Sequence, residues 1–338
     1  MPTRRDFLKS LAGFGAGSLL SWNLMLPKVA VSQLFKAEQT ADTQDIPNTQ
    51  TSKLSFVVVS DIHIGRLNAI HHFSALLQDN FYSKPDAMVV VGDLGDGVER
   101  DYNLLNHELL RHKMVIDYPI FWTIGNHEFY GSFYKNGFWS PRTFPNDETE
   151  DQAVNRFLTF AKRDKIYSDT WIKGFHFLFL GTEKSRMSDR RYLDSAFLSS
   201  TQLDWLESAL SIEQKPSKPV FVFLHQPIPY TTLGGLQRGY VIQWRRLNDI
   251  LSQHPEVILF NGHTHFKIDY INMVSKENYN IVNSSSLAYP IDRKRHHILN
   301  SAPGFVVDVY DEKVVIRGKE YLTRDWISGA EINVPMAT

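Results

Sequence analysis

The sequence predicts an α/β protein in which two mixed β-sheets are stacked and covered by helices on both outer faces. Two patterns lead to this prediction. Up to Phe260, apolar runs that read as buried strands alternate with segments of helical periodicity. Beyond that point, strand-like runs follow one another without helices between them. Helices among strands first, and strands in succession later, favour a four-layer α-β-β-α sandwich.

The early part of the chain contains five apolar runs that predict buried strands. These runs are Phe56–Val59, Met88–Val91, Ile120–Ile124, Val220–Leu224 and Val257–Phe260. The predicted helices are Ala69–Asn80, Tyr102–Met114, Asp151–Arg163, Thr201–Leu210 and Trp244–Gln253. Thr201-Gln202-Leu203-Asp204 has the signature of a capping box, so we expect a helix to begin there. The later predicted strands are Lys267–Ile271, Tyr279–Asn283, Gly304–Tyr310 and Lys313–Gly318.

A short polar block follows each of the five early strands. The blocks are Asp61-Ile62-His63, Gly92-Asp93-Leu94-Gly95-Asp96, Gly125-Asn126-His127-Glu128, the single His225, and Gly262-His263-Thr264-His265. In an open α/β sheet, ligands bind at the carboxyl ends of the strands. Oxygen and imidazole side chains that converge there would repel one another or lose solvation unless cations lay among them. The blocks therefore predict a metal centre at one edge of the sheets.

The number of candidate ligands favours two metal ions. The candidates are Asp61, His63, Asp93, Asn126, His225, His263 and His265. One catalytic zinc ion needs about three protein ligands, whereas these seven supply about four for each of two ions if Asp93 bridges them. Two ions about 3.5–4 Å apart can hold an attacking hydroxide and a phosphoryl oxygen together. Because the chain has no cysteine, thiolate and iron–sulfur sites are excluded, and the ligand types suit manganese, iron or zinc.

In order along the chain, the motifs D-x-H, G-D-x-x-D, G-N-H-E, H and G-H-x-H resemble those of the calcineurin-like metallophosphoesterase superfamily. The resemblance covers Asp61 to His265, and the flanking strands extend it to near Ile316. It implies a four-layer sandwich and a hydrolase acting on phosphoric esters. One metal would be held by Asp61, His63, Asp93 and His265, and the other by Asp93, Asn126, His225 and His263.

The resemblance also implies two catalytic residues that bind no metal. His127 matches the histidine that faces the scissile oxygen and stabilises or protonates the leaving group. Asp96 matches the carboxylate that orients this histidine, and such a carboxylate fixes the tautomer of an imidazole and raises its basicity. Glu128 fills the acidic position that follows the histidine.

Two departures from related motifs narrow the substrate. The protein Ser/Thr phosphatases of this superfamily follow G-D-x-x-D with Arg-Gly, and that arginine grips phosphate, but here Gly97 and Val98 follow Asp96. Purple acid phosphatases place a tyrosine ligand where this chain has Asp96. The motifs are then most similar to those of the bacterial class that includes cyclic-nucleotide phosphodiesterase-like enzymes. The His225-Gln226-Pro227 turn also resembles that class.

The N-terminus is expected to be an export signal. Thr3-Arg4-Arg5-Asp6-Phe7-Leu8-Lys9 resembles the twin-arginine motif, and a glycine-rich apolar stretch, Leu11 to Leu26, follows it. Residues 1–32 then form the signal peptide, with cleavage after Ser32, and the polar residues 33–53 form a disordered linker. Recognition by the twin-arginine export machinery would deliver the enzyme to the periplasm or the exterior. An uncut signal could tether it to the membrane.

The remaining residues, 54–338, are expected to form a single phosphoesterase domain. Lys and Arg together number 36, against 37 for Asp and Glu, so the net charge gives no signal for nucleic-acid binding. We expect a phosphoester substrate, with a preference for phosphodiester or nucleotide-type compounds. A broad-specificity phosphomonoesterase is the alternative within the class, and a non-catalytic binding scaffold on the same fold is the alternative outside it.

An aromatic segment, residues 129–142, follows directly on the third polar block. Its aromatic residues alternate with Gly, Ser and Asn, as in a loop that packs its own side chains. One interpretation is a structural Ω-loop. The other is a substrate cap in which Tyr130, Phe133, Tyr134 or Trp139 stacks on a flat group while Lys135 or Arg142 meets phosphate. A second candidate rim is Tyr230–Gly235, just after His225.

Overall fold

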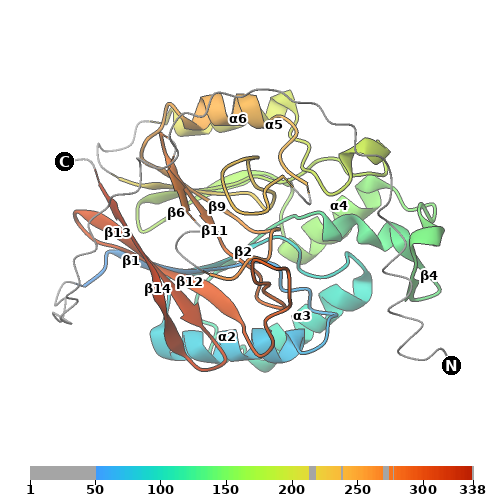
Figure 1. Cartoon of the computed structure of the whole chain (residues 1–338), viewed down its shortest axis with the longest axis horizontal. Coiled ribbons are helices and arrows are strands. Elements are labelled where there is room, and N and C mark those ends of the chain that lie inside the picture. The colour runs from blue at the N-terminus through green and yellow to red at the C-terminus, as the bar shows by residue number, and fades with distance from the viewer. Residues whose placement is uncertain (1–50, 213–217, 237–238, 269–273, 277, 337–338) are drawn as a thin grey trace. The chain divides into compact units, whose positions relative to one another are not determined.

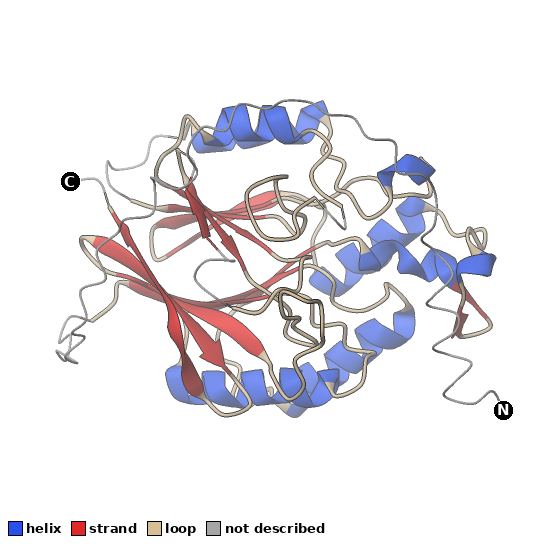
Figure 2. Ribbon diagram, in the orientation of Figure 1, coloured by secondary structure: helices blue, strands red, loops and turns tan. Residues whose placement is uncertain are grey.

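The computed structural model describes residues 51–336, except 213–217, 237–238, 269–273 and 277. Two six-stranded sheets lie face to face, and helices cover their outer faces (Figures 1 and 2). This arrangement confirms the predicted α/β fold with two mixed sheets. The predicted signal peptide and all but the last three residues of the predicted linker lie outside the described residues.

The first sheet combines three parallel strands with three antiparallel ones. In order across the sheet, its strands are β14 (Asp325–Pro335), β13 (Lys313–Glu320), β12 (Pro303–Val309), β1 (Leu54–Val59), β2 (Ala87–Val91) and β3 (Ile120–Thr123). Strands β1, β2 and β3 are parallel, so their carboxyl ends share one edge. Helices α2 (Ala69–Ser83), α3 (Glu99–Arg111) and α4 (Glu150–Ala161) pack apolar side chains on its outer face.

The second sheet is built in the same way. Its strands, in order, are β10 (Val274–Lys276), β11 (Asn280–Asn283), β9 (Val257–Asn261), β8 (Val220–Phe223), β7 (Phe175–Phe179) and β6 (Ser168–Ile172). The four central strands are parallel, whereas β10 and β6 are antiparallel edge strands. Helices α5 (Ser200–Leu210) and α6 (Trp244–Leu251) cover its outer face.

Phenylalanine rings fill the space between the two sheets. Phe56 of β1 meets Phe177 and Phe221 of the facing sheet edge to face, with ring centroids 4.9 and 4.8 Å apart. Such geometry is preferred by aromatic pairs and adds to the free energy gained by burial. Because side chains alternate across a strand, Val57 and Val59 point to the opposite face and pack under the helices. This core fixes the register of the strands and so the positions of the residues at their ends.

A short excursion follows β3 and projects to one side of the sandwich. It comprises the 3₁₀ helix η1 (His127–Phe133), the hairpin of β4 (Tyr134–Lys135) and β5 (Phe138–Trp139), and the short helix η2 (Pro141–Thr143). A third 3₁₀ helix, η3 (Arg190–Tyr192), precedes α5. No helix in the described part of the chain is both long enough and apolar enough to cross a membrane.

Some boundaries differ from the prediction. Helix α5 is capped by Ser199, whose hydroxyl accepts the Gln202 amide at 3.2 Å, so the capping box predicted at Thr201 was wrong. The capping box lies instead at Thr149 and Gln152, where α4 begins. The strands that were not predicted are β4, β5, β6, β7, β10 and β14. In the expected strand Lys267–Ile271, Lys267 and Ile268 lie in no strand, and the other residues fall outside the described set.

Candidate metal centre

All seven predicted ligands lie together at the carboxyl ends of β1, β2, β3, β8 and β9. Backbone hydrogen bonds tie the loops that carry them. The His63 amide donates to the Asp93 carbonyl at 3.0 Å, and the Gly262 amide donates to the His225 carbonyl at 2.9 Å. Six of the seven ligands are less than 5% exposed, and Asn126 is 7% exposed. The structure therefore brings the polar blocks into one buried cluster.

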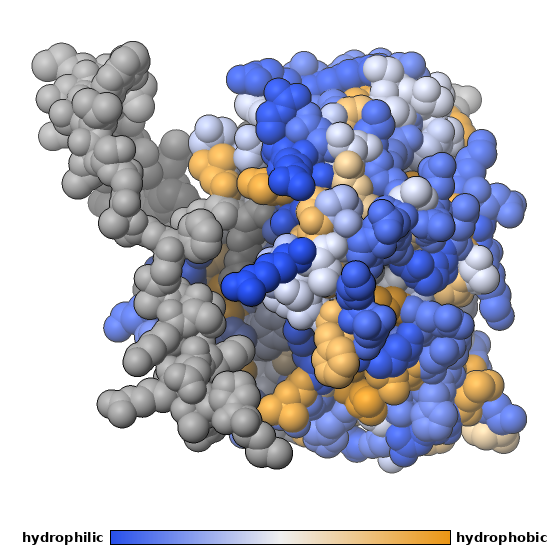
Figure 3. All heavy atoms as spheres, turned by 90° about the vertical axis from the view of Figure 1, so that its right-hand side faces the viewer, coloured by the Kyte–Doolittle hydropathy of each residue, from blue (hydrophilic) through white to orange (hydrophobic). Residues whose placement is uncertain are grey.

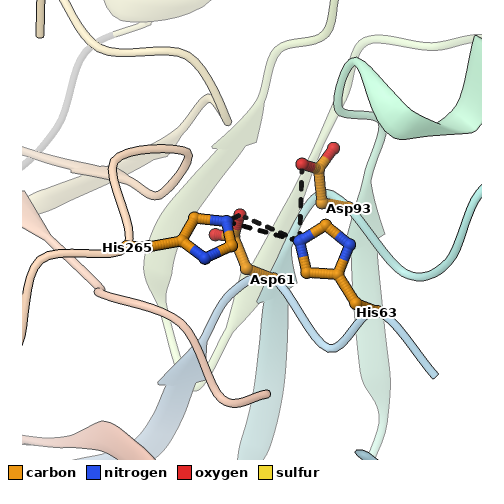
Figure 4. A group of neighbouring side chains, drawn as sticks. All are labelled: Asp61, His63, Asp93 and His265. Carbon is orange, nitrogen blue, oxygen red and sulfur yellow. Dashed lines mark hydrogen bonds and ion pairs between the residues drawn. The ribbon is translucent and has the colours of Figure 1, made fainter. Parts of the chain in front are cut away.

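Four ligands form the first group: Asp61, His63, Asp93 and His265. Figure 4 shows their side chains pointing toward one another from the strand ends. The two imidazoles face each other through their Nε2 atoms, 3.3 Å apart, and His265 Nε2 lies 2.8 Å from Asp61 Oδ1. Two ligands that each lie about 2.1 Å from a tetrahedral ion are separated by roughly 3.4 Å. The spacing therefore fits a shared cation.

The second group is formed by Asp93, His225 and His263, and Asn126 lies beside it. His225 Nε2 is 3.2 Å from Asp93 Oδ2, and Asn126 Oδ1 is 2.9 Å from His263 Nδ1. Asp93 Oδ2 also lies 3.9 Å from His63 Nε2 in the first group. Asp93 is thus the residue common to both groups, which is the position that a bridging carboxylate requires.

Several atoms that face the centre of the cluster have no hydrogen-bond partner although they are buried. They are Asp61 Oδ1, His225 Nε2 and His263 Nε2. The close approaches of Asp61 Oδ1 to His265 and of His225 Nε2 to Asp93 lack hydrogen-bond geometry. A buried polar atom without a partner costs about 1–3 kcal/mol. Metal ions among these atoms would supply the missing interactions. The buried His/Asp cluster therefore fits a dinuclear metal site, and the identity of the metals stays open.

In Asp61, Asp93 and His225, the polar atom that points away from the centre of the cluster is held by the protein. Asp61 Oδ2 accepts hydrogen bonds from the Ser60 hydroxyl and from the His263 amide, the latter at 3.0 Å. Asp93 Oδ1 accepts the His127 amide at 2.9 Å, and His225 Nδ1 lies 2.7 Å from the Val91 carbonyl. Such contacts from behind fix the rotamer and tautomer of a ligand before the metal binds.

The backbone of the ligand loops is strained. Positive φ angles occur at five of the seven ligands: Asp61, His63, Asp93, His263 and His265. This region costs a non-glycine residue roughly 1–2 kcal/mol, and such outliers cluster at functional sites. Gly92 before Asp93 also has a positive φ of 77°, and a Cβ there would lie 2.6 Å from His225 Cγ. Only glycine fits where the chain passes so close to a ligand.

The electrostatics of the cluster favour bound cations. Burial lowers the pKa of His63 and of His263 to about 4, so both rings stay neutral at pH 7, as metal ligands must be. Burial also disfavours a proton on His225, but Asp93 and Asp61 outweigh it and raise its pKa to about 10. The two carboxylates therefore draw positive charge to the point that His225 Nε2 faces.

The two predicted catalytic residues form a pair at the rim of the cluster. His127 Nδ1 lies 2.8 Å from Asp96 Oδ1, and His127 Nε2 lies 3.9 Å from Asp93 Oδ2. Burial lowers the pKa of His127, but Asp93 and Asp96 more than offset this and raise it above its ordinary value. The imidazole thus faces the cluster through Nε2 and is biased toward the protonated form that a general acid needs.

The aromatic segment supports this pair. The Tyr130 ring stacks on the His127 ring with centroids 3.9 Å apart, and the Tyr134 hydroxyl donates to Asp96 Oδ2 at 2.7 Å. Phe133 is buried, whereas Phe138 and Trp139 of the hairpin are 78% and 49% exposed. Figure 3 shows the face of the molecule on the side of this hairpin, where apolar patches lie among hydrophilic residues. Three of the four rings proposed for substrate stacking are therefore engaged within the protein.

Glu128 joins the two loops that carry Asp93 and His127. Its buried carboxylate accepts the backbone amides of Gly125, Leu94 and Asp93 at 2.6, 2.8 and 3.2 Å. Burial and the nearby Asp93 raise its pKa to about 7. The sequence placed Glu128 in the motif but did not reveal this role.

Sequence reasoning also missed Arg66 and Tyr289. Arg66 Nη2 lies 3.2 Å from Asp96 Oδ1, and the Tyr289 ring lies 4.9 and 4.4 Å from the rings of His63 and His265. Arg66 stands three residues after His63, so its place beside the first motif was visible in the sequence. Nothing in the sequence around Tyr289 indicated its contact with the ligands.

Comparison with known proteins assigns the family. The family model described as calcineurin-like phosphoesterase matches residues 54–267, which is more than half of the chain. The chain is 25% identical over 225 residues to a 3',5'-cyclic-nucleotide phosphodiesterase of Nostoc sp., covering 63% of this chain and 71% of that protein. It is 28% identical over 114 residues to an uncharacterized metallophosphoesterase of Campylobacter jejuni, covering 33% of this chain but only 30% of that protein.

Among solved structures, a dimetal phosphatase from Danio rerio superposes with a TM-score of 0.60 at 13% identity. The superposition covers 85% of this chain and 100% of that chain. At such low identity the likeness shows a shared fold.

We predict that the folded protein binds two divalent ions per chain, because two ligand groups share Asp93. Asp93→Ala should reduce the content to less than one ion per chain and lower the melting temperature, since the other ligands stay clustered without compensation. Elemental analysis and thermal denaturation measure both effects, and Asp249→Ala on the exposed face of α6 is the control. One ion or none in active wild-type protein contradicts this prediction.

Glu128→Gln should destabilise the protein by about 1–3 kcal/mol, because an amide cannot accept three backbone hydrogen bonds as a carboxylate does. The loss should be seen in urea unfolding of the metal-loaded protein, together with weaker metal binding. Glu207→Gln, an exposed change of the same kind on α5, should alter neither quantity. If Glu128→Gln left both unchanged, the carboxylate would not hold the loops together.

Proposed function

The chain belongs to the calcineurin-like phosphoesterase family, and on this basis we propose that it is an exported enzyme that hydrolyses phosphodiester or nucleotide-type substrates. Its domain is a metallophosphoesterase domain, that of a hydrolase acting on phosphoric ester bonds. The observation that carries the proposal is the pair of ligand groups that share Asp93, with the His127–Asp96 pair beside them.

The proposed chemistry divides between the metals and the residues around them. When bound, two divalent ions supply the Lewis acidity that activates water and neutralises charge on the phosphoryl oxygens. Asp61, His63, Asp93 and His265 would hold one ion, and Asp93, Asn126, His225 and His263 the other. His127 would donate a proton from Nε2 to the leaving oxygen, because that atom faces the cluster. Asp96 would hold the imidazole in this orientation through Nδ1.

The preference for diesters is supported by two observations. The Nostoc relative is named as a cyclic-nucleotide phosphodiesterase, and Gly97 and Val98 follow Asp96 in place of the Arg-Gly pair whose arginine grips phosphate in the protein phosphatases. Metal-loaded protein should therefore hydrolyse bis-p-nitrophenyl phosphate with a higher kcat/KM than p-nitrophenyl phosphate. The reverse order would favour the phosphomonoesterase. Hydrolysis of neither would favour a binding scaffold, although a scaffold gives no physical reason to bury this ligand set.

His127→Ala should lower kcat by about two to four orders of magnitude without changing the metal content, because His127 acts on the leaving group and holds no metal. Asp96→Asn should act in the same direction with a smaller effect. An alkyl phosphodiester is the right substrate, since nitrophenolate leaves without a proton and hides part of the defect. His107→Ala, on the exposed face of α3, is the control. Loss of a metal ion from His127→Ala would overturn this assignment.

Export through the twin-arginine pathway is part of the proposal and rests on Arg4, Arg5 and the apolar stretch that follows them. That pathway carries folded proteins, so a metal centre loaded in the cytoplasm could be exported intact. A location in the periplasm or outside the cell suits the scavenging of phosphate from nucleotides, lipid head groups or wall polymers.

Replacing Arg4 and Arg5 together by Lys should keep active, metal-loaded enzyme in the cytoplasm, since the paired arginines are read by a receptor. Cell fractionation followed by diesterase assay measures the distribution. N-terminal sequencing of exported wild-type protein shows whether cleavage falls after Ser32 or the signal stays as a tether. Wild-type activity confined to the cytoplasm would refute export.

A further inference from the structure

A strongly basic loop stands beside the metal centre. It consists of Arg293, Lys294, Arg295, His296 and His297, all exposed, and the segment has one carboxylate, Asp292. We call residues 293–297 the basic loop. A run of charge on a surface is by itself only a solvated segment, so its position relative to the metal ligands decides whether it has a function.

The loop is fixed to the backbone of a metal ligand. The Ile291 amide donates to the His265 carbonyl at 2.7 Å, and the Lys267 amide donates to the Ile291 carbonyl at 2.9 Å. Ile291 is 2% exposed, so the segment is anchored in the protein. The backbone that leads into the basic loop is thus registered against the chain that carries His265.

The shape of the loop is also defined. Asp292 Oδ1 accepts the amides of Lys294 and His296 at 2.8 and 2.9 Å, and the Ile298 amide closes the turn on the Pro290 carbonyl at 2.8 Å. Asp292 is therefore used largely to fold the turn. The side chains of Arg293, Lys294 and Arg295 are left to project from it into solvent.

Tyr289 connects the basic loop with the ligands. Its ring stacks on the His297 ring with centroids 5.3 Å apart and lies 4.4 Å from the ring of His265. Two ring contacts thus separate the basic loop from a metal ligand. The contact places His297, the last residue of the basic loop, near the ligands, and the charges of the loop can influence an anion bound there if they lie within about a Debye length of it, roughly 8 Å at physiological ionic strength.

Arg66 adds positive charge beside Asp96, at the rim of the cluster. The charge of Arg66 also acts on the Tyr289 hydroxyl, because burial raises the pKa of this hydroxyl and the guanidinium opposes the rise. The Arg66 side chain is 48% exposed and uses one Nη for Asp96. A guanidinium has five N–H donors in a planar fork, so others can meet an anion.

We propose that Arg66 and the basic loop form a basic rim that binds a second phosphate group of the substrate, next to the phosphate that is hydrolysed. The inference rests on the proposed phosphodiesterase function and narrows its substrate class. The preferred substrates are those in which a further phosphate follows the scissile one at the spacing of a nucleotide or polyol phosphate. The neutral balance of charge in the whole chain conceals this local excess.

The test compares two dinucleotides that differ by one phosphate, thymidylyl-thymidine and its 5'-phosphorylated form. In wild-type protein at low salt, kcat/KM should be about tenfold higher for the phosphorylated form, mainly through KM, because three exposed charges each contribute modestly. The combined change Arg293→Gln, Lys294→Gln and Arg295→Gln should remove most of this preference and leave the part that Arg66 contributes. A general defect affects both substrates and leaves the ratio unchanged.

A matched control removes three positive charges from the opposite edge of the sheets. Lys84 and Lys113 precede the parallel strands β2 and β3, and Lys313 begins β13, so all three lie away from the carboxyl ends. Changing these lysines to Gln should leave the ratio as in the wild type. Arg66→Gln should lower the ratio, and Arg66→Lys should restore part of it because the charge is kept. Raising the salt concentration should also lower the ratio.

The source of the second phosphate is tested with glycerophosphoglycerol and its terminally phosphorylated form. If the phosphorylated form is preferred equally in both pairs, the rim recognises the phosphate alone. If it is preferred only in the dinucleotide pair, the rim recognises nucleotides. A wild-type ratio of one, or a ratio unchanged by the triple substitution, overturns the basic rim.

The rim and the proposed function fail in different ways. Binding of the two dinucleotides to metal-loaded His127→Ala protein, measured by calorimetry, gives the same ratio without turnover. If no diester is hydrolysed but the phosphorylated dinucleotide still binds more tightly through the loop, the result supports the rim and contradicts the phosphodiesterase function. If diesters are hydrolysed and the two dinucleotides bind with equal affinity, the result contradicts the rim and leaves the phosphodiesterase function supported.

Discussion

The structure depends on one constraint: seven metal-ligand candidates must stay buried together at the ends of five strands. Carboxylates and imidazoles at less than 5 Å from one another are unfavourable without cations. The backbone adds to the cost, because five of these residues have positive φ. At roughly 1–2 kcal/mol each, this strain is comparable with the net stability of a domain, about 5–15 kcal/mol. The sandwich must therefore hold the loops from outside the cluster.

The holding groups form a polar layer beneath the ligands. The Ser60 hydroxyl lies within hydrogen-bond distance of both Asp61 Oδ2 and the Val91 carbonyl and shares its one proton between these acceptors, so it links the ends of β1 and β2. Asn283 of β11 donates to the Gly262 carbonyl at 2.7 Å and accepts the Thr264 hydroxyl at 3.0 Å, which supports the turn of His263 and His265. The contact of Ser60 is with Asp61 Oδ2 and leaves Asp61 Oδ1 free to face the cluster. The contacts of Asn283 are with Gly262 and Thr264, so they occupy no ligand atom of His263 or His265. The cluster is thus preorganised by hydrogen bonds that do not compete with a metal.

The strand ends were predictable from the sequence because buried parallel strands are continuous apolar runs. The polar residue after each run must lie at the carboxyl edge of the sheet, where ligands bind. The capping of α5 was misplaced because Ser199 and Thr201 offer nearly equal side chains, and the difference lies in tertiary contacts such as that of Ser199 with Glu183. Strand β6 escaped prediction because it is an edge strand whose Asp169 and Thr170 interrupt the apolar pattern.

Contacts between distant segments could not be predicted in the same way. Tyr134 and Asp96 meet across 38 positions of the sequence, and Tyr289 reaches His63 across a still longer separation. Neither contact leaves a periodic or compositional signal, because it depends on how the loops cross at the sheet edge. The stacking of Tyr130 on His127 is an intermediate case. The aromatic composition of that segment indicated packing near the site, but it did not distinguish packing on a substrate from packing on His127.

In this molecule the negative charges of the site lie buried in the cluster, and the positive charges lie on exposed residues outside it. The carboxylates Asp61 and Asp93 lie within 4 Å of imidazole nitrogens, buried, so their attraction for cations is short in range and little screened. Arg66 and the basic loop lie further out and in contact with solvent, where their attraction for anions extends only about a Debye length. The proposed rim therefore carries its charge on exposed side chains, whereas the carboxylates that attract cations are buried. A site that must retain two cations and also admit a polyanion requires this separation of the two kinds of charge.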